Sequence, residues 1–534
     1  MSPAPRTSFG ASESTRLHTP PLLTGRIAEL LAGKKIAMTG VTGFIGEQML
    51  WKFLTECPDT TTAVLVRRKG SLSATQRVAS LLKKKKIFKD LVAEAGSVEK
   101  LMADRIDVIE GDLPDAPELP RDIDVMVHCA GDVSFDPPID AAFKTNVLGV
   151  KALLRRFRES CSDENGNLVR VPHYVHISTA YTAGRRRGPI PEAAHPHEVD
   201  YEAETRAALA MTDLVEARSR TSEQLTALRK EAEKLHRRAG YLTTSEDTER
   251  RRLEWVKQEL VAAGTERARS LGWTDVYTFA KAMGEAVVAD LCRDMQVSIV
   301  RPAIVESSLR YPHPGWIEGF KMADPIILAY GRGQLPEFPA SPDAVIDIIP
   351  CDYVVNTIVA VCATQPKVGE PEFYHCSSGA RNPLTFRGIY EHIRSYFSRH
   401  PYRDGQGSHQ LATWNFPGPE PVERKLWFAE KGVAIGNRLL GFAPRGKRTR
   451  AAARVLDKTA KQLDFLNRYL GLYGEYLQSE LHFVDDCTLA LHNSLHEKDR
   501  ETFGFDSGTL DWTHYLEDVH APAITDPVRR LEAA

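Results

Sequence analysis

The feature that most constrains this chain is a glycine-rich loop, TGVTGFIG, at residues 39–46. It follows the apolar run KKIAMT and precedes FIGEQMLWKFL, which has apolar residues at helical spacing. Glycines at three-residue intervals between a strand and a helix are typical of a turn that holds the pyrophosphate of a dinucleotide. In such a turn Gly40 bends the chain, Gly43 lets the backbone approach the phosphates, and Gly46 lets the helix pack on the strand. An ordinary tight turn is the alternative.

The helix that follows this loop supplies the remaining predicted contacts to the phosphates. The first N–H groups of a helix have no partner within the helix, and its dipole favours a negative charge at that end. We therefore add Thr42, Phe44 and Ile45 to the predicted cofactor-binding residues.

The residues after the second predicted strand indicate which dinucleotide is bound. About 20 residues past the glycine loop, a site for NAD carries a carboxylate that binds the ribose 2′-hydroxyl. Here the strand ends in VLVRRKGS, so Arg67 and Arg68 stand where a 2′-phosphate would lie. Guanidinium groups bind phosphate with charge-assisted hydrogen bonds, which predicts NADPH. Exposed basic residues are also common in loops, so a solvated loop remains the alternative.

Further cofactor contacts are predicted at the ends of later strands. Asp112 and Leu113, in EGDL, follow the third strand, where Asp112 can accept from the adenine amino group or simply cap the next turn. Ala130 follows the fourth strand, and Pro302 and Ile304 follow the sixth, where they would line the nicotinamide end.

Short β-rich runs alternate with helical segments between residues 33 and 304, which predicts a doubly wound parallel α/β sheet. The predicted strands are Lys35–Thr39, Ala63–Val66, Ile106–Glu110, Val125–Cys129, Tyr174–Ser178 and Val297–Arg301. We expect residues 26–400 to form this domain, after a disordered tail at 1–25 that is rich in Ser, Thr and Pro.

Two segments depart from this alternation. Residues 201–270 are unusually charged, with 27 charged residues among 70, and we expect a solvated helical insertion, or less readily a dimerisation arm or lid. Residues 422–525 have apolar residues at helical spacing and predict a helical C-terminal domain. Within it the basic run from Arg445 to Lys461 suits a solvated helix face, with an acidic ligand or peripheral membrane contact as the alternative.

A reactive site is predicted where a strand end meets a helix. VYTFAKAMGE puts Tyr277 and Lys281 four residues apart, on one helical face. Reduction of a carbonyl needs a proton donor, and a nearby ammonium stabilises a phenolate and so lowers the pKa of a tyrosine. Lys281 can do this while holding the nicotinamide ribose. In VHISTAYTAG, Thr179 is the favoured hydroxyl to polarise the substrate carbonyl, with Ser178 in support; both can instead satisfy backbone groups.

Bulk composition excludes several classes of protein. The net charge of −2 gives no general attraction to nucleic acid, and the eight cysteines are scattered without a metal-binding spacing. The cysteine usage suits a reducing, cytoplasmic location. No stretch approaches the length of a membrane span, so we expect a protein without a transmembrane segment. The oligomeric state is left open.

Together these motifs resemble the extended short-chain dehydrogenase/reductase superfamily, and within it the fatty acyl-CoA reductases, especially alcohol-forming enzymes of the bacterial type. The similarity covers about residues 30–525 and is carried by TGVTGFIG, HCAGDVSFD (128–136), TNVLG (145–149), HISTAY (176–181), VYTFAK (276–281), RPAIVESSLRYPHPGWIEG (301–319) and DIIPCDYVVN (347–356), with FVDDCTLALHNSL and FGFDSGTLDWTHYLEDV in the C-terminal region.

The resemblance implies that Thr179, Tyr277 and Lys281 form the active site and that NADPH reduces a long-chain acyl-CoA to a fatty alcohol through an enzyme-bound aldehyde. Release of the aldehyde, or another activity of the superfamily such as a nucleotide-sugar epimerase or reductase, is the alternative. Candidates for the acyl channel are 314–319, Phe320, Met322 and the C-terminal helices, although Trp316 can equally be core.

Overall fold

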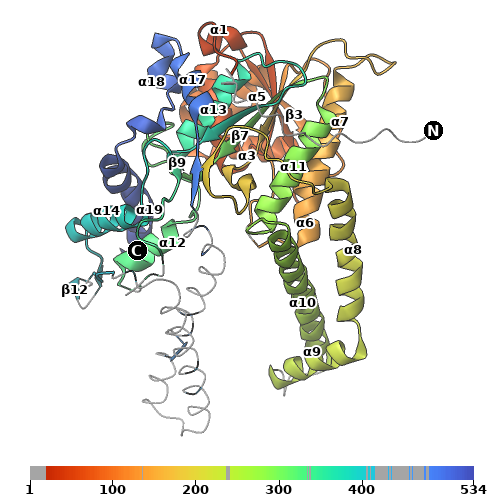
Figure 1. Cartoon of the computed structure of the whole chain (residues 1–534), viewed down its shortest axis with the longest axis vertical. Helices are drawn as coiled ribbons and strands as arrows, with labels where there is room; N and C mark the ends of the chain where they lie inside the picture. The colour runs from red at the N-terminus through yellow and green to blue at the C-terminus, as the bar shows by residue number, and fades with distance from the viewer. Residues whose placement is uncertain are drawn as a thin grey trace.

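The computed structural model describes residues 20–134, 136–235, 241–333, 340–404 and 480–533, with shorter pieces and single residues between these ranges (Figure 1). Residues 1–19 of the predicted tail and most of the basic run at 445–461 lie outside the described residues. Residues 20–25 are placed: Leu23 is buried, and its N–H donates to Ser494 Oγ at 3.1 Å. No helix in the described part of the chain is long and apolar enough to span a membrane.

A seven-stranded parallel sheet forms the centre of the molecule, in the order β10-β7-β5-β4-β1-β2-β3. The strands are β1 (Lys35–Thr39), β2 (Thr61–Val66), β3 (Ile106–Glu110), β4 (Val125–His128), β5 (His173–Ile177), β7 (Gln296–Pro302) and β10 (Glu372–Cys376). Six of them were predicted, and the edge strand β10 was not. The order reverses between β1 and β4, and in such sheets ligands bind outside the carboxyl ends of the strands at this point.

Helices cover both faces of the sheet because successive side chains of its buried strands point to opposite sides. Met38 packs with α2 (Phe44–Glu56) and α13 (Cys351–Cys362) on one face, and Ala37 packs with α7 (Gly149–Ser160) and α11 (Val276–Leu291) on the other. In Figure 1, α13 lies to the left of the sheet and α7 and α11 to the right. The predicted doubly wound α/β fold is confirmed.

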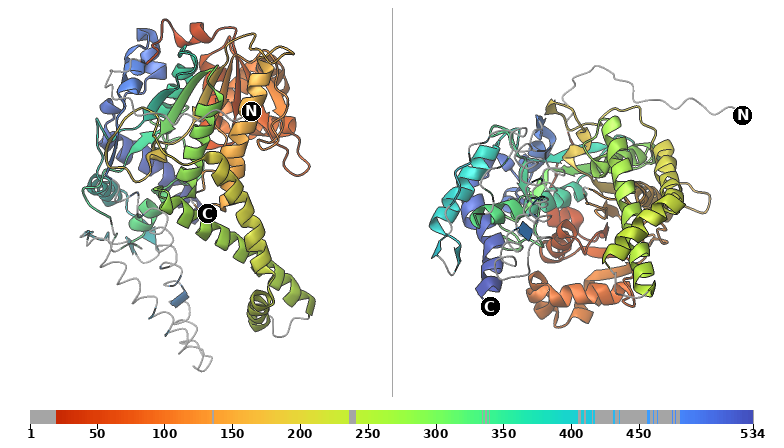
Figure 2. Two further views of the ribbon diagram at one scale, coloured as in Figure 1. Left: turned by 45° about the vertical axis from the view of Figure 1, so that its right-hand side comes forward. Right: turned by 90° about the horizontal axis from the view of Figure 1, so that it is seen from below.

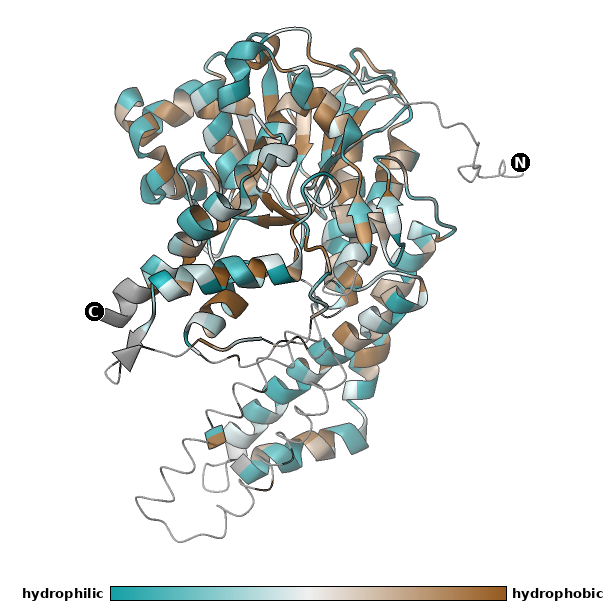
Figure 3. Cartoon of the chain, turned by 60° about the vertical axis from the view of Figure 1, so that its left-hand side comes forward, coloured by the Kyte–Doolittle hydropathy of each residue, from teal (hydrophilic) through white to brown (hydrophobic). Residues whose placement is uncertain are grey.

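The charged insertion is a helical arm that projects from the body of the molecule (Figures 1 and 2). It consists of α8 (Tyr201–Ser219), α9 (Ser222–Leu235) and α10 (Tyr241–Ser270). Figure 3 shows long hydrophilic stretches on these helices, in keeping with their charge. Inside the arm the buried guanidinium of Arg252 pairs with Glu216 across the helices, at 2.7 Å.

The arm leaves and rejoins the domain at one narrow neck. The N–H of Arg185, where the chain departs, donates to the carbonyl of Gly272, where it returns, at 2.9 Å. Beside this bond, the indole of Trp273 donates to the carbonyl of Thr182 at 3.1 Å. A Cβ at Gly184 would lie 2.5 Å from the carbonyl oxygen of Gly272, so only glycine permits this approach. The two ends of the excursion are therefore held together, and the base of the arm also packs on the domain through the apolar side chains of α8 and α10.

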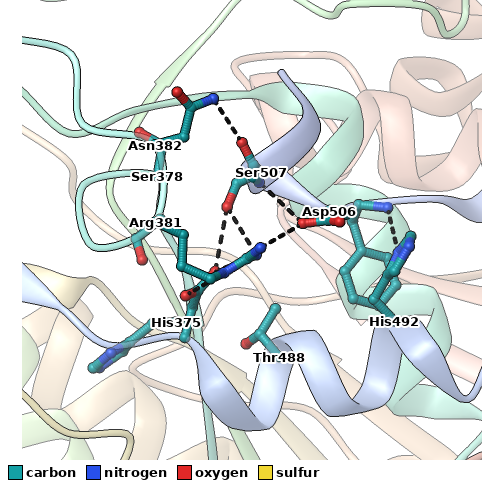
Figure 4. A network of polar contacts seen from close by, with 12 residues as sticks. His375, Ser378, Arg381, Asn382, Thr488, His492, Asp506 and Ser507 are labelled. Atoms are coloured by element: carbon teal, nitrogen blue, oxygen red, sulfur yellow. Dashed lines mark hydrogen bonds and ion pairs between the residues drawn. The ribbon is translucent and has the colours of Figure 1, made fainter. Parts of the chain in front are cut away.

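The described C-terminal segment, 480–533, packs into the same body as the sheet. Its strand β13 (Leu481–Phe483) pairs in parallel with β6 (Gly188–Ile190), and its apolar side chains share one core with α13. Arg381, just after β10, ties the segment down: it bonds Asp485 at 2.7 Å and Asp506 at 2.6 Å (Figure 4). These partly buried ion pairs fix the chain across a long sequence separation.

Candidate active site

A cleft of about 1270 Å³ opens at the carboxyl ends of the strands, where the strand order reverses. It is lined by nearly all the residues predicted to bind the cofactor and by three of the four predicted reactive residues. These are Gly40, Thr42, Gly43, Phe44, Ile45, Gly46, Arg67, Asp112, Leu113, Ala130, Pro302 and Ile304, with Ser178, Thr179 and Tyr277. Arg68 and Lys281 are not among the lining residues.

The glycine loop has the geometry that a phosphate-binding turn requires. Gly40 has a φ of +80°, and the N–H of Gly43 donates to its carbonyl at 2.8 Å to close the turn. A Cβ at Gly46 would lie 2.1 Å from that carbonyl oxygen, so α2 could not pack this closely with any other residue. No side chain caps α2, which leaves its first N–H groups available to an anion in the cleft.

The basic residues after β2 divide between the cleft and its surroundings. Arg67 lines the cleft and lies 3.8 Å from Asp112, with both side chains exposed. Arg68 instead approaches Glu110 at 3.4 Å. Arg77, which sequence reasoning missed, also lines the cleft, and its guanidinium donates to the carbonyl of Arg67 at 2.5 Å. The sequence indicates the position of Arg77 only indirectly. A capping box at Ser73 starts α3 (Ala74–Lys84) just beyond the loop, and this start directs Arg77 back toward β2.

The structure brings the predicted hydroxyl and phenol together. Thr179 follows β5, and Tyr277 lies in the first turn of α11, whose N-cap Asp275 accepts from the N–H of Thr278 at 2.8 Å. The side chains of Thr179 and Tyr277 are hydrogen-bonded to each other, and both line the cleft. A carbonyl oxygen placed between them can accept from both groups, which is the arrangement that stabilises a developing oxyanion.

Lys281 lies one turn further along α11 and is buried. Its ammonium donates to the carbonyl of Ile177 at 2.6 Å, and burial lowers its pKa to about 8. The expected lowering of the pKa of Tyr277 is not found: burial, followed by the charge of Asp275, raises it. The physical reason is that the ammonium points to the end of β5 and contributes no resolved stabilisation to the phenolate.

Most of the α/β domain matches a known protein family. Residues 38–358 match the NAD_binding_4 family, described as Male sterility protein. The chain belongs to that family. Membership of this NAD-binding family supports a nicotinamide cofactor.

The chain is also similar over most of its length to curated reductases. It is 28% identical to fatty acyl-CoA reductase 2, chloroplastic, of Arabidopsis thaliana, covering 93% of this chain and 79% of that one. It is 28% identical to the alcohol-forming fatty acyl-CoA reductase of Simmondsia chinensis, covering 94% and 99%. Fatty acyl-CoA reductase 2 of Homo sapiens is 26% identical, over 92% and 84%.

Ser178 lines the cleft, but its hydroxyl is engaged by a buried carboxylate. Its hydroxyl donates to the carboxylate of Glu285, which forms a buried ion pair with Arg301 at 2.7 Å. Glu285 was missed, although it continues the spacing of Tyr277 and Lys281 along α11. The hydrogen bond from Ser178 joins the end of β5 to α11, and the ion pair joins α11 to β7, so Glu285 holds together the elements that carry Thr179 and Tyr277.

The loop after β4 is braced by Asn146. Its side-chain amide accepts from the N–H and donates to the carbonyl of Asp132, both at 2.9 Å. A Cβ at Gly131 would lie 2.9 Å from Asn146 Oδ1 and 3.9 Å from Lys281 Nζ. The loop therefore closes over the lysine and separates it from the open cleft.

The predicted acyl-channel residues take different places. Trp316 is buried and stacks on Phe44 with ring centroids 5.0 Å apart, so it supports the glycine loop from behind. Phe320 and Met322 line the cleft itself.

A buried polar cluster anchors the helix that follows this segment, α12 (Asp324–Gly331). Asp324 lies 3.2 Å from His520, whose other ring nitrogen is 3.0 Å from Ser307 Oγ. Burial and the neighbouring charge of Asp324 raise the pKa of Glu306 to about 8, while the nearby His520 and Lys321 oppose the shift. The cluster joins α12 to the C-terminal segment.

Proposed function

We propose that this chain is an NADPH-dependent, alcohol-forming fatty acyl-CoA reductase. The observation that carries the proposal is the hydrogen-bonded pair Thr179 and Tyr277, which lines the same cleft as the glycine loop. The names of its relatives supply the substrate class, a fatty acyl-CoA.

The residues present fit a dinucleotide. The uncapped start of α2 and the glycine turn would hold the pyrophosphate, and Arg67 with Arg77 would hold the 2′-phosphate that distinguishes NADPH. Pro302 and Ile304 line the part of the cleft assigned to the nicotinamide. When bound there, NADPH supplies hydride.

The chain's own groups act on the substrate. Thr179 and Tyr277 would donate hydrogen bonds to the oxygen of the thioester carbonyl and stabilise the negative charge that develops on it. Tyr277 would give its proton to that oxygen, forming a hemithioacetal, and collapse of this species would expel coenzyme A and leave an aldehyde. The same two groups can serve the aldehyde oxygen in a second reduction to the alcohol. Lys281, ammonium-bearing and buried beside the end of β5, would keep this region positively charged.

Incubation of the protein with palmitoyl-CoA and NADPH, followed by gas chromatography, tests the proposal. We expect hexadecanol, with two NADPH consumed for each alcohol formed. One NADPH per product, with hexadecanal accumulating, would show an aldehyde-releasing reductase. Absence of both products, with turnover of a nucleotide sugar, would replace the proposal by an epimerase or a related activity.

A further inference from the structure

A second cavity, wholly distinct in character, adjoins the cleft. It is a narrow slot of about 50 Å³ between α12, α14 (Phe386–Arg399) and the short strands β8 (Ile304–Glu306) and β9 (Ile348–Pro350). Every described residue that lines it is aliphatic, aromatic or methionine. The two tyrosines turn their hydroxyls to the backbone: Tyr330 donates to Ala412, and Tyr390 accepts from the N–H of Trp414. The slot therefore offers an apolar surface to an occupant.

The sequence builds this slot from two helical stripes that face each other. On α14 the lining residues are Phe386, Ile389, Tyr390 and Ile393, at the spacing of one helical face. On α12 they include Ile327 and Tyr330. Two apolar stripes normally interdigitate to close density, so a gap retained between them is unusual for a core.

The slot is continuous with the active-site cleft. Ile304 and Met322 line both, and each is half-buried. Ile304 lies two residues beyond Pro302, whose carbonyl accepts from the hydroxyl of Thr179 at 3.4 Å. The polypeptide between β7 and β8 thus leads from Thr179 to the mouth of the slot. An acyl group whose carbonyl contacts Thr179 can reach the slot along this segment. Met322 is unbranched and adaptable, which suits a side chain that yields to an entering ligand.

The cleft near this mouth exposes apolar side chains. Phe320 is 58% exposed and Val133 67% exposed, and both line the cleft. Large exposed apolar groups beside a polar nucleotide site indicate a ligand with an apolar part.

One wall of the slot is made of packed aromatic rings. Trp414 stacks on Tyr390 with centroids 5.1 Å apart and meets Tyr330 edge-on at 5.0 Å. Its indole N–H donates to the carbonyl of Leu335 at 2.9 Å, which fixes the ring. A wall held in this way limits how far an occupant can reach.

We propose that the slot between α12 and α14 takes the last methylenes of the acyl-CoA's hydrocarbon tail, which enter between Ile304 and Met322, while the larger cleft holds the rest of the tail. This assignment rests on the proposed function, because the occupant is that reaction's substrate. It places chain-length selection in the slot-lining residues of α12 and α14 and away from Trp316, which stacks on Phe44 of the glycine loop.

Two variants of opposite sense test the assignment. Ile389→Trp narrows the slot, and Ile393→Ala enlarges it, because both residues line it. We measure kcat/KM for octanoyl-CoA, palmitoyl-CoA and longer substrates. Ile389→Trp should lower the value for palmitoyl-CoA by about tenfold or more, since each methylene kept from burial costs about 0.8 kcal/mol, and should leave octanoyl-CoA within about twofold. Ile393→Ala should shift the preference toward longer chains.

The matched control is Glu391→Trp, which adds the same ring to an exposed position of α14. It should leave the chain-length profile unchanged. An equal loss for all chain lengths in Ile389→Trp, or an unchanged profile in both slot variants, overturns the assignment. Unaltered NADPH binding and thermal unfolding show that each variant is folded; where Ile389→Trp is unfolded, Ile393→Ala alone decides.

A binding measurement separates this proposal from the proposed function. Titration calorimetry with palmitoyl-CoA should show weaker binding to Ile389→Trp than to the unaltered protein or to Glu391→Trp. If palmitoyl-CoA binds with this pattern but is never reduced, the proposed function fails and the slot stands. If palmitoyl-CoA is reduced with no dependence on the slot residues, the slot assignment fails and the function stands.

Discussion

The cleft and the slot meet at Ile304 and Met322, yet they are made in different ways. The cleft is formed by strand ends and by backbone that only glycine permits, with polar and charged side chains at fixed places. The slot is formed by apolar side chains on two helices, and its shape depends on their volumes. Changes in the cleft should therefore act on chemistry and on cofactor binding, whereas changes in the slot should act on substrate range.

The largest effect should come from Tyr277→Phe, which removes the proton donor and one of the two groups that face the carbonyl oxygen. We expect turnover to fall by about 10²–10⁴-fold while the Kd for NADPH stays within about twofold. Stopped-flow measurement of NADPH oxidation and fluorescence titration of NADPH give the two values. Tyr201→Phe is the control, because it removes a tyrosine hydroxyl that donates to Asp290 on the far side of α11. Retained turnover in Tyr277→Phe contradicts the site.

A backbone change should come next. Gly46→Ala places a methyl group against the carbonyl of Gly40, and overpacking of this kind costs about 1–3 kcal/mol. We expect weaker NADPH binding and a lower Tm. Gly388→Ala, on the slot helix α14, meets only side-chain atoms, Leu384 Cδ1 at 3.3 Å and Thr385 Oγ1 at 3.4 Å, and should change stability by less than about 1 kcal/mol. Equal sensitivity of the two positions would remove the contrast between a backbone-built cleft and a side-chain-built slot.

Cofactor preference should respond more modestly. Replacing both Arg67 and Arg77 by Ala should raise the KM for NADPH by about tenfold, the low end for charged hydrogen bonds because Arg67 is exposed. The KM for NADH should not change. Arg68→Ala serves as the control, since Arg68 pairs with Glu110 outside the cleft. The 2′-phosphate is not bound here if the double variant raises the KM for NADH as much as the KM for NADPH, and if Arg68→Ala raises the KM for NADPH by the same factor.

The smallest effect concerns the polar anchor of α12. Because the pKa of Glu306 is about 8 in the folded protein and near 4.5 in the unfolded chain, folding takes up a proton between these values. Stability should fall by about 1 kcal/mol from pH 7 to pH 8 on this account, and Glu306→Gln should flatten that part of the curve. The raised pKa of His520 acts in the same direction. Urea unfolding at several pH values measures the slope; a Glu306→Gln curve parallel to that of the unaltered protein contradicts the assignment.

The comparison also explains what could be predicted from sequence. The glycine loop, Thr179 and the Tyr277–Lys281 spacing belong to short motifs whose geometry is set by neighbouring residues, so the cleft was foreseen in most of its parts. The edge strand β10 was missed because its five residues, EFYHC, mix polar and apolar side chains, so the sequence has no continuous apolar run there although the strand is largely buried. The pairing of Ser178 with Glu285 was missed because it depends on how β5 and α11 pack.

The slot could not be predicted for the same reason. Its walls come from segments far apart in the chain, and neither stripe carries a motif that indicates a gap. Of the candidates that the sequence suggested, Met322 lines the mouth of the slot, whereas Trp316 stacks on Phe44 of the glycine loop. Amphipathic helices indicate only which face is buried, and the partner of that face is known once the chain is folded.

The neck of the helical arm has a consequence for how the enzyme can be altered. Thr179 and Tyr277 are separated by the whole arm along the chain, but the bond from Arg185 to Gly272 closes that excursion beside the domain. The base of the arm still packs beside Tyr277, because Gly264 of α10 lies against Val276 of α11. Shortening only the outer part of the arm, or grafting a reporter domain at its tip, is therefore the engineering route that should spare the candidate site.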